Sequence, residues 1–257
     1  MLKLRREWNL FLVLARMHLR SSDYRTAFGA LWSFMGPLMT FLILYTIFRD
    51  RFGHTIPLFP LRILIGIISL NFFVSVVHIT MNAIKQSREI VINSLTPSEV
   101  LILAPLAVPV VRFSVEITLC IFLAIMNHVM SVQNLPLIFL ISFLYLVLSV
   151  GVGLLLSAFD CLAADITEIW NRIVPMFYFI TPIFYVPEML SGWARGLIYW
   201  LNPITPYLMT YLSLFSVERL SANDSIAATA QVILYPIVFF TAGFIAFKKL
   251  EKQIVQE

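Results

Sequence analysis

The sequence predicts an all-α integral membrane protein with six transmembrane helices, an N-terminal amphipathic interface helix, and re-entrant gate helices before the last span. Two observations predict this class. Of the 257 residues, 60% are hydrophobic and only 12% are charged, which is roughly half the charged fraction of a soluble domain. The apolar residues form long uncharged runs, and a membrane-crossing helix needs about 20 of them. We therefore predict a single transmembrane domain, residues 1–257, with no room for a large soluble domain.

Residues 1–25 predict a helix that lies along the cytoplasmic surface of the membrane. Apolar residues such as Trp8, Leu12 and Leu19 recur at helical spacing, with cations on the other face. A disordered basic tail is the alternative, and the tryptophan and leucines disfavour it. The segment also lacks the short apolar run and small residues of a cleaved signal peptide.

The first predicted span, Thr26–Phe48, carries no charge but is interrupted by Trp32, Gly36 and Pro37. We expect Trp32 at the cytoplasmic interface, where tryptophan is common. Pro37 is expected in the first turns of the helix, where a missing N–H costs least. Gly36 is expected to allow a neighbouring helix to approach closely.

Five more spans complete the predicted topology. They are Ile63–Ile84, Val100–Met130, Leu135–Phe159, Ile169–Pro187 and Ile226–Phe247. Residues 188–217, before the last span, are apolar but broken by prolines, and we expect them to enter and leave the membrane on one side. Such irregular backbone is tolerated at membrane depth only against protein or a water-lined cavity.

The distribution of basic residues orients this topology. Twelve of the 18 Lys and Arg residues fall in segments that it places in the cytoplasm, and five fall outside. Because cytoplasmic loops are enriched in Lys and Arg, both termini are predicted to be cytoplasmic. The positive net charge of +4 therefore indicates membrane orientation and not nucleic-acid binding.

Few residues indicate catalysis. The chain has no G-x-x-x-x-G-K-[ST] loop, so it is not expected to hydrolyse nucleotide itself. Its four histidines have no partner at metal-ligand spacing, so no metal site is expected. The acids Asp160, Asp165 and Glu168 are clustered, although a helix cap or a solvated face is their more common role.

Arg112 and Glu116 are the ionisable pair inside a predicted span. They stand four residues apart, on one helix face, where they can neutralise each other. Buried charge is costly in a bilayer, so the pair should face protein or water. Two interpretations stay open: a contact that lines a polar path, and a structural pair near the cytoplasmic surface. Aromatic side chains far from the interfaces, such as Phe72 and Tyr178, are candidates for stacking on sugar rings.

The stretch "FGALWSFMGPLMTFLILYTIF" resembles the first-span signature of ABC-2-type permeases that export polysaccharides. It carries Gly29, Trp32 and Pro37 at the family's spacing, followed by an aromatic-rich run with Tyr45. "FITPIFYVPEML" is similar to the family's fifth-span segment and the turn after it. "LNPITPY" is similar to the Asn-Pro-x-x-Pro motif before the last span. These matches follow the family's order over nearly the whole chain.

The resemblance implies the membrane subunit of an ATP-driven exporter of lipid-linked polysaccharide, of the O-antigen, capsule or teichoic-acid type, in the bacterial inner membrane. It implies a homodimer with two copies of a separate cytoplasmic ATPase, which would bind ATP and Mg²⁺. Residues 85–100 would be the cytoplasmic coupling segment that docks on this ATPase, and residues 188–206 the outer gate.

The candidate site residues fall into three groups. The candidates for ATPase coupling are Lys85, Arg88, Glu89 and Asn93. The candidates for the substrate path are Trp32, Tyr45, Phe72, Phe73, Arg112, Glu116, Tyr178 and Tyr185. The candidates for the gate are Pro182, Pro187, Asn202, Pro203 and Pro206.

Other functions stay open at this point. One is an ABC-2 permease for a drug or a simple lipid. Another is an intramembrane glycolipid-modifying enzyme, which would use the acids at 160, 165 and 168. An uncoupled channel or scaffold is disfavoured by the polar segment between the second and third spans.

Overall fold

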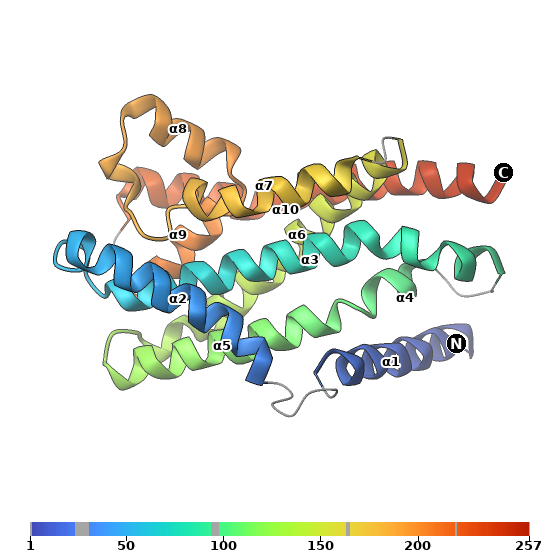
Figure 1. Ribbon diagram of the computed structural model, residues 1–257, viewed down its shortest axis with the longest axis horizontal. Coiled ribbons are helices and arrows are strands. Elements are labelled where there is room, and N and C mark those ends of the chain that lie inside the picture. Colours follow the sequence, from blue (N-terminus) through green and yellow to red (C-terminus); the bar gives the residue numbers. More distant parts are fainter. Residues whose placement is uncertain (1, 24–30, 94–97, 163–164, 219, 257) are drawn as a thin grey trace.

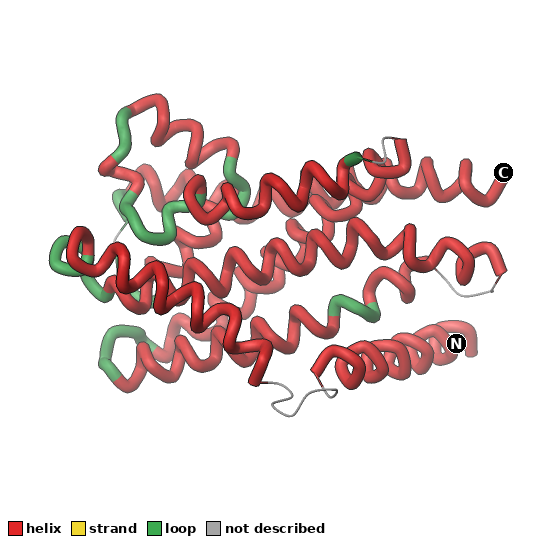
Figure 2. Tube along the Cα trace, in the orientation of Figure 1, coloured by secondary structure: helices red, strands yellow, loops and turns green. Residues whose placement is uncertain are grey.

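Long helices that run along one common axis make up the chain (Figure 1). The computed structural model describes residues 2–23, 31–93, 98–162, 165–218 and 220–256, and these residues contain no strand (Figure 2). The helices are α1 Leu2–Asp23, α2 Leu31–Phe52, α3 Phe59–Asn93, α4 Ser98–Leu103, α5 Ala107–Met126, α6 Leu135–Leu162, α7 Ile166–Ile180, α8 Gly192–Leu201, α9 Thr205–Leu214 and α10 Ala222–Gln256, with 3-10 turns η1 Val132–Asn134 and η2 Pro187–Met189.

The beginning of α1 and the end of α10 lie at one end of the bundle, here called the terminal end (Figure 1). The α2–α3 turn, η1 and α8 lie at the opposite end, here called the distal end. By length and composition, four described stretches can cross a membrane. They are Phe59–Asn82, Val100–Met126, Val132–Asp160 and Ala222–Lys249. The α-helical membrane class is therefore confirmed.

The structure corrects several predicted boundaries. Helix α3 continues past Ile84 to Asn93, so the first half of the predicted coupling segment is an extension of a span. The predicted span Val100–Met130 is two helices, α4 and α5, separated by a turn next to Pro105. Pro105 has no backbone N–H, so it cannot donate the hydrogen bond that a continuous helix would need there.

Helix α7 also departs from prediction, because it ends at Ile180 and not at Pro187. Thr181 precedes Pro182 and is extended, with ψ of 131°, since a residue before proline avoids the helical region. Helix α2 begins at Leu31, and the predicted start at Thr26 lies outside the described residues. It ends at Phe52, four residues beyond the predicted Phe48.

Helix α6 is the centre of the bundle, packed between α3 and α10. Its contact with α10 depends on two glycines. A Cβ on Gly151 would lie 2.5 Å from the backbone N of Phe240, and one on Gly243 would lie 2.4 Å from the carbonyl O of Gly151. These distances are too short for any side chain, so the two backbones approach as closely as small residues permit.

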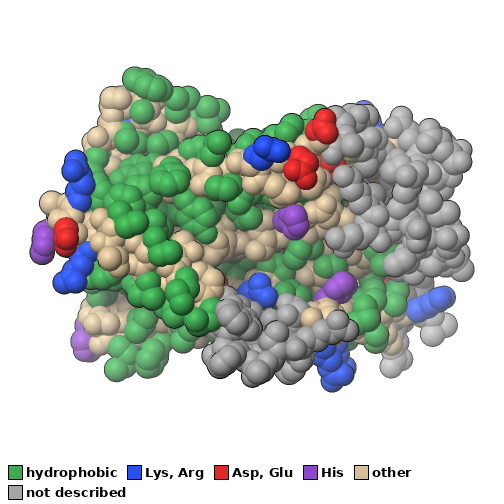
Figure 3. All heavy atoms as spheres, viewed as in Figure 1, with side chains coloured by type: hydrophobic (Ala, Val, Ile, Leu, Met, Phe, Trp, Pro, Cys, Tyr) green, Lys and Arg blue, Asp and Glu red, His purple; other side chains and the backbone are tan. Residues whose placement is uncertain are grey.

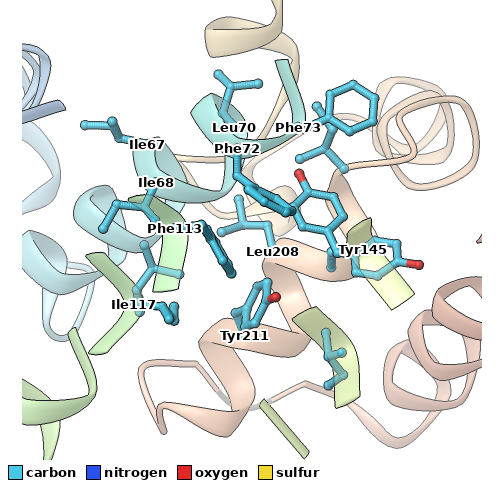
Figure 4. Close-up of a cluster of buried hydrophobic side chains, with 14 of the residues drawn as sticks. Ile67, Ile68, Leu70, Phe72, Phe73, Phe113, Ile117, Tyr145, Leu208 and Tyr211 are labelled. Carbon is cyan, nitrogen blue, oxygen red and sulfur yellow. The ribbon is translucent and has the colours of Figure 1, made fainter. Parts of the chain in front are cut away.

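Aromatic rings fill the core beside α6. Phe72 stacks against Phe113 with ring centroids 4.3 Å apart, and Tyr145 stacks on Tyr207 at 4.6 Å. In Figure 4 the rings of Phe72, Phe113, Tyr145 and Tyr211 converge around Leu208. These rings come from α3, α5, α6 and α9, so the cluster binds four helices into one core.

Helix α1 packs against α4 and α5. Its Ala15 is buried, whereas Trp8 is 60% exposed and stacks on Phe11. Apolar side chains therefore remain uncovered on a helix that also carries cations, as expected for a helix at a membrane interface. In the view of Figure 3, charged side chains lie at the left edge and in the right half, and the surface between them is mainly hydrophobic.

Helices α8 and α9 form a short hairpin at the distal end. The C-terminal end of α9 lies at that end, because the side-chain amide of Asn134 donates to the carbonyl of Leu214. The start of α9 lies deeper, because Tyr207 stacks on Tyr145, which is about 15 Å along α6 from Leu135 at 1.5 Å per residue. The α8–α9 turn is therefore well inside the bundle.

Candidate functional site

A polar hollow lies between α2, α3 and α5, and it has a volume of about 160 Å³. Its lining residues include Pro37, Asn71, Phe72, Ser75, Arg112 and Glu116. Asn71 and Ser75 stand four residues apart on α3, as Arg112 and Glu116 do on α5, so each helix turns one polar face to the hollow. Sequence reasoning predicted that Arg112 and Glu116 share a face and that this face meets protein or water.

A fourth helix, α7, reaches this hollow through a side-chain hydrogen bond. The hydroxyl of Tyr178, on α7, donates to Oδ1 of Asn71 at 2.7 Å. Three candidates for the substrate path, Phe72, Arg112 and Glu116, thus border one hollow, and a fourth is attached through Asn71. Sequence reasoning missed Asn71 and Ser75, although two polar residues four apart in an apolar span were a usable signal.

A larger apolar hollow of about 360 Å³ lies along the same three helices. Its lining includes Leu38 and Phe41 of α2, Leu61 and Leu64 of α3, and Leu123 of α5. Leu61 and Leu64 are closer to the distal end than Asn71. The three helices therefore hold a polar hollow and, toward the distal end, an apolar one.

The other candidates for the substrate path are dispersed. Phe73 is 1% exposed and packs between Tyr145 and Trp170, so it belongs to the core of the described residues. Tyr45 stacks on Phe41 at 5.6 Å. The side chain of Trp32 lies outside the described residues.

The hydroxyl of Tyr185, in the extended segment after α7, donates to the carbonyls of Phe179 and Ile180 at 3.1 and 3.2 Å. This contact folds the segment back onto the end of α7. The Tyr185 hydroxyl is therefore bonded to backbone carbonyls. In the present arrangement this candidate for the substrate path stabilises the end of α7.

The predicted gate residues surround the α8–α9 hairpin. Asn202, which is buried, donates from Nδ2 to Oγ1 of Thr181 at 2.9 Å and accepts from the backbone N of Ile204 at 3.0 Å. Asn202 therefore joins the end of α7 to the hairpin turn. Pro206 is in the first turn of α9 and Pro187 begins η2, positions where proline fits because no N–H is needed there. Pro203 is in the turn itself.

Arg62 holds three segments at the distal end together, and sequence reasoning assigned it no role. Its side chain is fully buried. One guanidinium nitrogen donates to the carboxylate of Glu218, and the other donates to the carbonyl of Pro182 at 3.0 Å and that of Tyr185 at 2.7 Å. A single cation thus joins the start of α3, the segment after α7 and the segment after α9.

Two side chains of α10 bind the C-terminal end of α8. Gln231 Nε2 donates to the carbonyl of Tyr199 at 3.0 Å, and the Tyr235 hydroxyl donates to the carbonyl of Trp200 at 3.0 Å. The last carbonyls of a helix have no partner within the helix. Gln231 provides such a partner in the buried interior, and Tyr235 provides one at the exposed surface of the bundle.

The clustered acids lie around the start of α7. Asp160 Oδ1 accepts from the backbone N and from Oγ1 of Thr167, at 3.1 and 3.0 Å, so it caps the start of α7. Asp165 and Glu168 are exposed. Among the described residues, no group of three His, Cys, Asp or Glu is placed to hold a metal.

The predicted coupling residues lie at the terminal end of α3. They are Lys85, Arg88, Glu89 and Asn93, and their side chains lie outside the described residues. Helix α4 then leads back into the bundle.

No protein-family model matches the chain. It is 24% identical over 211 residues to an O-antigen export system permease protein RfbA of Myxococcus xanthus, with 81% of each chain covered. Two proteins of the same description from Klebsiella pneumoniae are 22% identical over 209 residues, 81% of this chain and 80% of theirs, and 21% identical over 252 residues, 97% and 95%. The chain is therefore similar to O-antigen export permeases over 81–97% of its length, in agreement with the family resemblance of its motifs.

Proposed function

We propose that the chain is the transmembrane subunit of an ATP-driven exporter that moves lipid-linked polysaccharide of the O-antigen type across the bacterial inner membrane. The observation that carries this function is similarity to permeases of O-antigen export over 81–97% of the chain. A drug permease is not favoured, since the relatives are described as permeases of O-antigen export. A glycolipid-modifying enzyme is not favoured, since the clustered acids serve as a cap or face solvent.

Six crossings are the topology that we propose. To the four apolar stretches we add α2, which at 22 residues is about 33 Å long, and α7, which at 15 residues is about 22 Å long. The extended segment after α7 lengthens that crossing. An even number agrees with α1 and the end of α10 at one end of the bundle (Figure 1), and the basic residues favour the cytoplasm for that end.

The α8–α9 hairpin is proposed as a re-entrant element at the outer mouth. Its turn lies about 15 Å below the distal end, roughly half the hydrocarbon thickness. Backbone at such depth needs partners from protein. The partners are Asn202 at the turn, and Gln231 and Tyr235 at the end of α8.

The two hollows support a substrate with a polar and an apolar part. The polar hollow offers an amide, a hydroxyl, a guanidinium and a carboxylate, which suit the hydroxyl-rich and charged part of a lipid-linked glycan. The apolar hollow beside it suits a hydrocarbon chain. Lateral access between α2 and α5 would let such a lipid enter from the bilayer.

The proposed exporter also contains an ATPase and a second copy of this chain. The ATPase, which binds ATP and Mg²⁺, would dock on residues 85–100. A second copy of this chain would cover the open face of α2, where a Cβ on Gly36 meets nothing within 4 Å. We propose that the expected close approach at Gly36 is made by this second copy, because no described residue of the same chain lies within 4 Å of that Cβ.

A deletion strain tests the function. Deleting the gene should remove polymer from the cell surface and leave lipid-linked polymer inside, and the wild-type gene should restore export. The purified chain should carry an ATPase subunit with it. Unchanged surface glycan in the deletion strain, with an altered drug response, would indicate a drug permease. Glycolipid modification by the isolated chain would indicate an enzyme.

A further inference from the structure

The two limbs of the hairpin are held very differently. In α9, the side chains of Tyr207, Leu208, Met209, Tyr211 and Leu212 are all fully buried. Two of their hydroxyls are bonded inside the core: Tyr207 donates to the carbonyl of Val232 at 2.9 Å, and Tyr211 pairs with Ser142 at 2.9 Å. Moving α9 would break the aromatic core shown in Figure 4.

Helix α8, by contrast, is mostly uncovered. Tyr199 is its one buried side chain, whereas Trp193 is 75% exposed and Leu201 is 73% exposed. A Cβ placed on Gly192 or Gly196 would meet nothing within 4 Å. The C-terminal end of α8 is held by the buried Tyr199 and by the donors Gln231 and Tyr235, but the rest of the helix can change position without opening a cavity in the core.

Both ends of α8 adjoin extended residues that can serve as joints. Leu190 and Ser191 precede it with ψ of 150° and 153°. Asn202 follows it with ψ of 106°, and Pro203 comes next. A ten-residue helix between two such joints can move as one rigid rod, since hinges are commonly a few residues at element ends.

One side chain in the N-terminal half of α8 reaches both neighbouring segments. Arg195 Nη2 lies 3.0 Å from Oδ2 of Asp224, at the start of α10, and 3.4 Å from Oε1 of Glu188, in η2. The Arg195 side chain is 37% exposed, so these ion pairs are reached by water and can be exchanged for hydration. The joint at Asn202 stays fixed through Thr181, so release of Arg195 would free the outer half of α8 first.

We propose that α8 is the moving limb of the gate, that α9 is its fixed limb, and that Arg195 is the positioning residue that holds α8 against Asp224 and Glu188. This inference rests on the proposed function, because the hairpin is a gate only if the chain is an exporter. When the ion pairs of Arg195 break, α8 rotates about the Asn202 joint and the outer mouth of the gate widens. The aromatic core under α9 stays intact.

Hydrogen–deuterium exchange on the full-length protein in lipid nanodiscs tests this division. Backbone amides of α8 should exchange at least about tenfold faster than those of α9. Arg195→Gln should raise exchange in α8 a further few-fold and leave α9 unchanged, and Arg195→Lys should keep much of the wild-type rate. Arg51→Gln, which removes an exposed cation at the same end, is the matched control and should change neither helix.

A second readout separates movement from structural damage. Proteoliposomes with Arg195→Gln should leak a small hydrophilic dye faster than wild-type ones, at an unchanged unfolding temperature. Equal exchange in α8 and α9, or equal acceleration of both by Arg195→Gln, would overturn the proposal. That outcome leaves the export function standing, whereas unchanged surface glycan in the deletion strain would remove the function without altering the exchange rates.

Discussion

The buried Arg62 and the partly buried Glu218 form an ion pair that links the start of α3 to the segment after α9, across 156 positions of the sequence. The same guanidinium donates to two backbone carbonyls after α7. The outer segments of the bundle thus depend on one cation that has no contact with bulk water. Removing it would leave a carboxylate and two carbonyls without their donor.

Arg62→Met should therefore lower the free energy of unfolding by about 3–5 kcal/mol, the usual cost of breaking one side of a buried pair. Thermal unfolding of the purified protein in detergent measures this. The double variant Arg62→Met with Glu218→Met should recover part of the loss, because both charges are then gone. Arg51→Met is the control, and an equal loss there would contradict a specific role for Arg62.

The contact between α6 and α10 gives a second prediction. Gly151→Ala should reduce the amount of folded protein sharply, since the new Cβ would overlap backbone atoms of Phe239 and Phe240, which cannot rotate away. Size-exclusion profiles of a fluorescent fusion would report it. Gly196→Ala, also inside a helix but in open space, should be neutral or stabilising by about 0.5–1 kcal/mol.

Paired variants decide between the two interpretations of Arg112 and Glu116. Arg112→Gln and Glu116→Gln should each reduce surface polymer while protein levels persist, because the polar hollow would lose a contact to the glycan. If the pair lies on the substrate path, the double variant stays defective in export even where its stability is restored. Full export by the double variant would instead identify a structural pair, as charge neutralisation alone would then suffice.

The coupling segment gives a fourth prediction, made from sequence. Arg88→Glu or Glu89→Lys should abolish export and co-purification of the ATPase while the protein still inserts, because charge reversal opposes docking at an interface. Surface polymer and pull-down from membranes measure the two effects. Lys249 is a cation near the end of α10, also at the terminal end of the bundle. The control variant Lys249→Glu should export normally. Normal export by both coupling variants would place the docking surface elsewhere.

Much of this architecture follows from apolar runs alone. The long spans were predictable because twenty uncharged residues have few other stable conformations, and α6 begins at the predicted Leu135. Prolines end two helices inside apolar runs that continue further. Helix α7 ends before Pro182, and α4 ends before Pro105. A hydropathy run measures membrane affinity and does not report whether the backbone can stay helical.

The site was less predictable, because its residues come from different helices. Spacing alone placed Arg112 and Glu116 on one face. Nothing local indicates that Arg62 pairs with Glu218, or that Gln231 serves a carbonyl of α8, since those contacts exist only after the helices assemble. Aromatic residues were ambiguous for the same reason: Phe72 borders a hollow, and its neighbour Phe73 is packing in the core.

The carbonyls of Tyr199 and Trp200 receive their hydrogen bonds from Gln231 and Tyr235, which are made later in translation than α8 itself. While the ribosome is still adding α10, the end of α8 has no donor and can rest only where water reaches it. Insertion of the last span brings the two donors to it. The α8–α9 hairpin therefore reaches its final position only after α10 has been synthesised. A chain truncated before residue 231 should insert its earlier spans, but its hairpin should not pack in the bundle.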